Sequence, residues 1–116
     1  MSMTTIYHNP RCGTSRNVLR TLQDRGITPT IIEYLETPLS SGELQGLIRN
    51  AGLAVRDAIR NKEPLFDELG LGDPALTDGQ LLDAIAAHPI LLNRPFVVTE
   101  KGTRLCRPAT AVEEIL

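Results

Sequence analysis

Residues 4–26 read TTIYHNPRCGTSRNVLRTLQDRG, a strand, a loop and a helix that set the architecture of the whole chain. Thr4–Tyr7 is rich in β-branched and aromatic residues, which is typical of a short strand. Asn-Pro and Gly interrupt His8–Thr14, so this segment is predicted to be a loop. From about Ser15 onward apolar residues recur at helical spacing, and Gly26 ends that helix.

The next segment, Thr30–Leu35, is predicted to be a second strand. It follows the first strand by a single helix, so the two strands should pair in parallel within a βαβ unit. The middle of the chain, about residues 40–88, then has helical patterns. Its predicted features are two capping boxes (Ser40 with Glu43, Thr77 with Gln80), a short helix at Val55–Asn61, a further helix after Pro64 and a helix end at His88-Pro89.

The last third of the chain is predicted to return to strands. Arg94–Thr99 and Thr103–Cys106 flank Glu100–Gly102, which is a hairpin signal. Thr110 with Glu113 is expected to cap a final helix. The order β-α-β, helices, β-β-α predicts an α/β, thioredoxin-like fold: a four-stranded mixed sheet with a helical insertion, in one domain over residues 1–116.

Composition and charge argue against one class of function and give a first hint of another. The net charge is −2 and aromatic residues make up 3% of the chain, which argues against binding of nucleic acid. Ten of the twelve basic residues are Arg, and only Lys62 and Lys101 are Lys. Arg suits bidentate recognition of oxyanions. A genome-wide preference for Arg would explain the same count.

Neither a membrane segment nor a signal peptide is predicted, so we expect a cytoplasmic protein. The two cysteines, Cys12 and Cys106, are far apart in the sequence and have no metal-type spacing. With only two His and two Cys, a structural zinc site is not expected.

Cys12 is the candidate nucleophile. It precedes a predicted helix, whose free N–H groups and dipole stabilise a thiolate and attract oxyanions. The alternative is a small buried thiol. His8 and Arg16, four residues to either side, could add positive potential, although His8 could equally bond the backbone. Ser15 could cap the helix, contact the sulfur, or do both.

The same loop excludes other chemistries. Ser15 stands where a dithiol enzyme has its second cysteine, and Val18 stands where a low-molecular-weight phosphatase loop needs Arg. No nucleotide-binding glycine motif is present. Cys106, on a predicted strand, is expected to be a core thiol rather than a catalytic one.

Three arginines are placed where they could hold an oxyanion. In thioredoxin-like folds a cis-proline at the position of Pro95 lies against the active-site cysteine, so Arg94, the residue before it, would face the site. Arg107 ends the next strand, and Arg60 lies in the helical insertion. Planar guanidinium groups suit a tetrahedral oxyanion, but arginines on a surface are usually just solvated.

Three segments, in order, resemble the glutaredoxin-coupled arsenate reductases of the thioredoxin superfamily. They are residues 6–17 around His8 and Cys12, residues 88–99 around Arg94 and Pro95, and residues 102–108 ending in Arg107-Pro108. The resemblance implies that Cys12 attacks arsenate, that His8 helps to lower its pKa and that Ser15 supports the thiolate. It also implies an oxyanion cage of Arg60, Arg94 and Arg107.

The resemblance further implies a reaction in which glutathione and glutaredoxin supply the electrons for reducing arsenate to arsenite, without a bound cofactor or metal. Two alternatives remain open. One is a glutathione-dependent thiol oxidoreductase with another substrate. The other is a regulator of the same fold that binds RNA polymerase, although those proteins carry a CxxC switch where this chain has Cys12-x-x-Ser15.

Overall fold

The computed structural model describes residues 3–116. Their contacts divide the chain into two compact units. The first unit runs up to Thr37 and resumes at Arg94–Leu116, and the second unit is Pro38–Asn93. The predicted insertion, about residues 40–88, falls within the second unit. The assignment of the whole chain to one domain stays a prediction.

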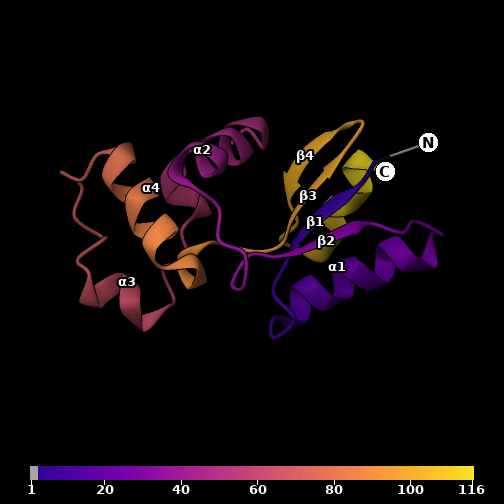
Figure 1. The fold of residues 1–116 in the computed structure, drawn as a ribbon, viewed down its shortest axis with the longest axis horizontal. Coiled ribbons are helices and arrows are strands. Elements are labelled where there is room, and N and C mark those ends of the chain that lie inside the picture. Colours follow the sequence, from indigo (N-terminus) through magenta and orange to yellow (C-terminus); the bar gives the residue numbers. More distant parts are fainter. Residues whose placement is uncertain (1–2) are drawn as a thin grey trace. The chain divides into compact units, whose positions relative to one another are not determined.

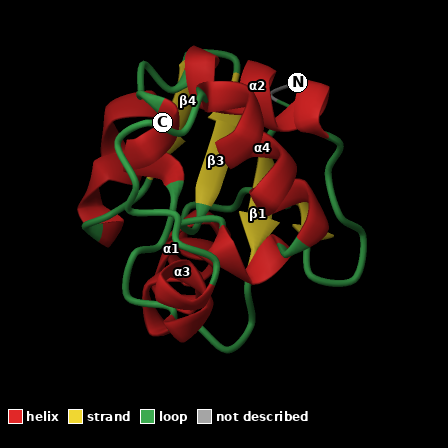
Figure 2. Cartoon of the chain, turned by 90° about the vertical axis from the view of Figure 1, so that its left-hand side faces the viewer, coloured by secondary structure: helices red, strands yellow, loops and turns green. Residues whose placement is uncertain are grey.

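The first unit is built on a four-stranded sheet. Its strands are β1 (Thr5–His8), β2 (Thr30–Glu33), β3 (Phe96–Thr99) and β4 (Gly102–Leu105), in the order β2-β1-β3-β4. β1 pairs in parallel with β2, whereas β3 pairs antiparallel with both β1 and β4. Figure 2 shows β3 between β1 and β4. The predicted mixed sheet, its parallel βαβ unit and its hairpin are confirmed.

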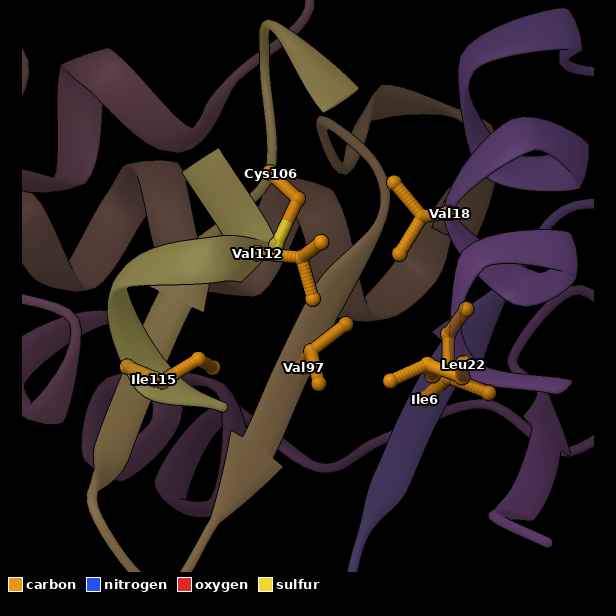
Figure 3. Packing of buried hydrophobic residues seen from close by; sticks show 7 residues of the cluster. All are labelled: Ile6, Val18, Leu22, Val97, Cys106, Val112 and Ile115. Carbon is orange, nitrogen blue, oxygen red and sulfur yellow. The ribbon is translucent and has the colours of Figure 1, made fainter. Parts of the chain in front are cut away.

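One face of this sheet is covered by α1 (Gly13–Asp24) and by the 3-10 helix η3 (Ala109–Ile115). Ile6 and Val97 from the sheet pack against Val18 and Leu22 of α1 and against the apolar residues of η3 (Figure 3). Burial of this cluster stabilises the unit by about 25 cal/mol per Å² of apolar surface removed from water. The helical spacing of Val18 and Leu22 thus serves to bury one stripe of α1.

The second unit is helical. Its elements are α2 (Ser41–Asn50), the 3-10 helix η1 (Val55–Ala58), α3 (Pro64–Glu68), α4 (Asp78–Ala87) and the 3-10 helix η2 (Pro89–Leu91) (Figure 1). Both predicted capping boxes are confirmed, because Ser40 and Thr77 exchange hydrogen bonds with Glu43 and Gln80. In residues 3–116, no helix combines the length and the hydrophobicity that a membrane-spanning segment requires.

Two predicted helix starts were wrong. α1 begins at Gly13 and takes Cys12, not Ser15, as its N-cap residue. The last helix is a 3-10 helix whose N-cap is Pro108, without a side-chain cap. The Glu113 carboxylate pairs with Arg25, the residue that follows α1, so it does not close a capping box with Thr110. A tertiary ion pair here replaces the local interaction that the sequence suggested.

Candidate active site

Cys12 lies in the loop between β1 and α1, at the carboxyl end of a central strand. Its backbone has extended geometry, and its carbonyl accepts the first helical hydrogen bond, from Arg16 N at 3.0 Å. Cys12 N donates to Asn9 O at 3.0 Å, which closes the loop into a turn. The sulfur is therefore held over the free N–H groups of the first helical turn, as the sequence predicted.

The pKa of the Cys12 thiol is lowered from 9.0 to about 7. Burial opposes this change, since it disfavours the charged thiolate. Hydrogen bonds from the Ser15 backbone N–H, the Arg94 and Arg107 side chains and the Thr14 backbone N–H outweigh burial. Near neutral pH about half of this thiol is therefore ionised and nucleophilic.

Two guanidinium groups from distant segments converge on the sulfur. Arg94 is buried, with 6% of its surface exposed, and precedes Pro95 across a cis peptide bond, as predicted. Arg107 Nη1 lies 3.7 Å from Cys12 Sγ and also donates to Arg94 O at 3.0 Å. The hairpin of β3 and β4 brings the two arginines together, since one precedes it and the other follows it.

His8, Asn9 and Ser15 form a buried network beneath the loop. His8 Nδ1 lies 2.6 Å from Ser15 Oγ, and Asn9 N donates to the same oxygen at 3.1 Å. Burial lowers the pKa of His8, Arg16 adds to this effect, and Glu33 partly opposes it. The neutral imidazole is thus favoured, and its Nδ1 can accept the Ser15 hydroxyl proton.

This network changes the roles expected for two residues. A neutral His8 brings no positive charge to the thiolate, so its contribution is to fix Ser15 and, with it, the start of α1. Ser15 lies in the first turn of α1 and supports the thiolate through its backbone N–H, while its side chain faces His8. The structure thus places both residues beside Cys12, and their roles in catalysis stay predictions.

Asn9 is a site residue that the sequence analysis treated only as part of a loop break. It is fully buried, and its Oδ1 accepts a hydrogen bond from Arg11 N at 3.0 Å. An Asn before Pro often forms such a turn with the backbone two residues on, and this was the available signal. Arg16, expected to add charge near the sulfur, instead donates to Pro10 O at 2.9 Å and braces the loop.

Arg60 belongs to the second unit. Its backbone N–H donates to Leu91 O at 2.7 Å, and its Nε lies 3.4 Å from a carboxylate oxygen of Glu63. Its membership of an oxyanion cage stays a prediction that rests on the resemblance.

Cys106 is a core residue, as predicted. It is fully buried in the cluster formed by the sheet, α1 and η3 (Figure 3). Burial, together with the charge of Glu114, raises the pKa of this thiol to about 12 despite the opposing charge of Arg104. Cys106 therefore stays a neutral thiol at physiological pH, in contrast with Cys12.

The described part of the chain contains no group of three or more His, Cys, Asp or Glu residues suited to a metal ion. The chemistry that residues 8–16, Arg94 and Arg107 can perform follows from one thiolate surrounded by donors. Guanidinium and backbone N–H groups stabilise negative oxygens, and the thiolate can attack an electrophilic centre that carries them.

Comparison with known proteins places this site in a family. Residues 7–115 match the model of the ArsC family. An arsenate reductase of Rhizobium meliloti (strain 1021) is 60% identical over 112 residues, covering 97% of this chain and 80% of the relative. An arsenate reductase of Escherichia coli (strain K12) is 53% identical over 116 residues, covering 100% of this chain and 82% of the relative.

Comparison with solved structures also finds arsenate reductases. An arsenate reductase from Vibrio cholerae superposes with a TM-score of 0.95 at 47% identity, covering 98% of each chain. The fold is therefore the thioredoxin-like α/β fold that was predicted. With a family match over nearly its full length and relatives at this level of identity, the chain belongs to the ArsC family.

Proposed function

We propose that this protein is an arsenate reductase in which the Cys12 thiolate attacks arsenate, and that glutathione and glutaredoxin supply the electrons. The observation that carries the proposal is the convergence of Arg94 and Arg107 on a thiol whose pKa is lowered to about 7. The similar proteins named arsenate reductase support arsenate as the oxyanion.

The first step is nucleophilic substitution at arsenic. Arsenate binds to the guanidinium groups of Arg94 and Arg107 and to the N–H groups of the loop, with Arg60 as a further proposed ligand. The Cys12 sulfur forms a bond to arsenic, and one arsenate oxygen leaves as water after taking up protons. The arginines stabilise the negative oxygens as the bond forms.

The second step transfers two electrons. A glutathione thiolate attacks the Cys12 sulfur, the sulfur–arsenic bond breaks, and its electron pair stays on arsenic, which becomes arsenite. A glutaredoxin thiolate then attacks the glutathione sulfur of the mixed disulfide and releases the Cys12 thiolate. This route needs one enzyme cysteine, in accordance with Ser15 at the position of a resolving thiol.

The test is arsenate-dependent oxidation of NADPH in an assay coupled through glutathione reductase, glutathione and glutaredoxin. We expect turnover by the wild type and by Cys106→Ser, and none by a folded Cys12→Ser variant. Wild-type protein that has a reduced Cys12 and active glutaredoxin but no arsenate-dependent turnover would overturn the proposal. Turnover of a mixed disulfide without arsenate would then favour a general thiol oxidoreductase.

A further inference from the structure

A pocket of about 360 Å³ lies beside the nucleophile loop, within the first unit. Its lining comes from two segments, the loop after β1 and the end of β2 with the turn that follows: Asn9, Pro10, Arg11, Glu33, Leu35 and Glu36. β1 and β2 are parallel, so their carboxyl ends meet at the same sheet edge. Pockets that bind small molecules have volumes of about 300–1,000 Å³, so this one is large enough.

The pocket and Cys12 share one loop of the chain. Arg11 directly precedes Cys12, and Asn9 both accepts the Cys12 N–H and holds Arg11 N through its side chain. Two hydrogen bonds therefore fix one wall of the pocket relative to the nucleophile. This wall of the pocket therefore belongs to the same loop as Cys12.

The charged residues of the pocket indicate which charges a ligand should carry. Arg11 supplies a cation, and two carboxylates come from Glu33 at the end of β2 and from Glu36 in the turn after it. Within residues 3–116, none of these three side chains forms an ion pair or a side-chain hydrogen bond, and all three are exposed, although the charge of Glu33 also acts on His8. Two carboxylates disfavour a second oxyanion, whereas a ligand carrying an ammonium next to a carboxylate matches both signs.

We propose that this pocket binds the α-amino-acid end of glutathione, with its ammonium toward Glu33 and Glu36 and its carboxylate toward Arg11. The proposal rests on the proposed function only for the choice of glutathione as the thiol. Binding there raises the local concentration of the glutathione sulfur at Cys12. The pocket thus makes the enzyme select a zwitterionic thiol over a simple one.

A thiol exchange without arsenate tests the subsite directly. The Cys12 thiolate attacks one sulfur of oxidised glutathione, the disulfide breaks, and the second glutathione leaves as a thiolate that takes a proton from water. The rate is compared with that for hydroxyethyl disulfide, which has no charged groups. The ratio of the two rates isolates recognition of the charged ends, because both reactions use the same nucleophile.

The informative variants are Arg11→Gln and Glu36→Gln, because Glu33 also acts on His8. Each removes one charge-assisted contact, so the ratio should fall about fivefold to tenfold, while the rate with hydroxyethyl disulfide changes little. Arg20→Gln and Glu100→Gln are matched controls, since both residues are exposed and lie outside the pocket lining. Their ratios should equal the wild-type ratio.

Equal ratios for Arg11→Gln, Glu36→Gln and the wild type would overturn the subsite. A wild-type protein with no preference for oxidised glutathione would overturn it as well. The proposed function fails separately: if arsenate is not reduced but the preference is present and lost in the two variants, the subsite stands and the arsenate assignment falls.

Discussion

Substitution of Arg107 by Gln should raise the pKa of Cys12. Four donors together outweigh burial and lower this pKa from 9.0 to about 7. If they share the effect equally, each accounts for at least about half a pKa unit. Arg107 is exposed, so its replacement leaves the core intact.

The consequence for the thiolate follows from this magnitude. At pH 7, a pKa near 7 leaves about half of Cys12 ionised, and a pKa higher by about half a unit leaves about one quarter. Alkylation of Cys12 by iodoacetamide should therefore slow about twofold at pH 7 in Arg107→Gln. Above about pH 9 the two proteins should react at nearly the same rate, because both thiols are then ionised.

The assay is the alkylation rate measured from about pH 5 to pH 10 by mass spectrometry of the intact protein. Arg20→Gln, which removes an exposed arginine of α1 outside the site, is the control and should keep the wild-type profile. A midpoint for Arg107→Gln that equals or falls below that of the wild type would refute the assignment of Arg107 as a donor to the thiolate.

Three other substitutions separate structural roles from chemical ones. Ser15→Ala removes the oxygen that His8 and Asn9 N share, so chemical denaturation should show that the free energy of unfolding falls by about 2 kcal/mol. The alkylation midpoint of Cys12 should move less than in Arg107→Gln, because the backbone N–H of residue 15 still donates to the sulfur. Cys106→Ala leaves a small cavity in the core and should cost about 1 kcal/mol in the same measurement without loss of turnover; a dead, folded variant would contradict this. Ser40→Ala opens the capping box of α2 and should cost about 1 kcal/mol without moving the alkylation midpoint; unchanged stability would argue against the cap.

The sheet and most helices could be predicted because the signals for them are local. The strand, loop and helix of residues 4–26, both capping boxes of the second unit and the hairpin at Glu100-Lys101 depend on residues close in sequence. The last helix was misjudged because its Glu113 has a partner 88 residues away, Arg25 at the end of α1. No local pattern carries that information.

At the site, the sequence singled out the cysteine whose pKa is lowered, but not all of its surroundings. Cys12, Arg94 and Arg107 were predicted, the last two by the resemblance rather than by spacing. The neutral state of His8 could not be foreseen, because it depends on burial beneath the loop and on the balance between Glu33 and Arg16. The contact of Arg16 with Pro10 O depends in the same way on the folded path of the loop.

In the proposed reaction, electrons pass from glutathione to arsenate through the sulfur of Cys12. The most direct test is a single turnover of the wild type with arsenate and glutathione but no glutaredoxin, in which arsenite and the modified Cys12 peptide are both quantified. The account predicts equal amounts of arsenite and of glutathione attached to Cys12, and no arsenite from Cys12→Ser. Arsenite that forms while Cys12 stays unmodified, or that Cys12→Ser produces at the same rate, would contradict it.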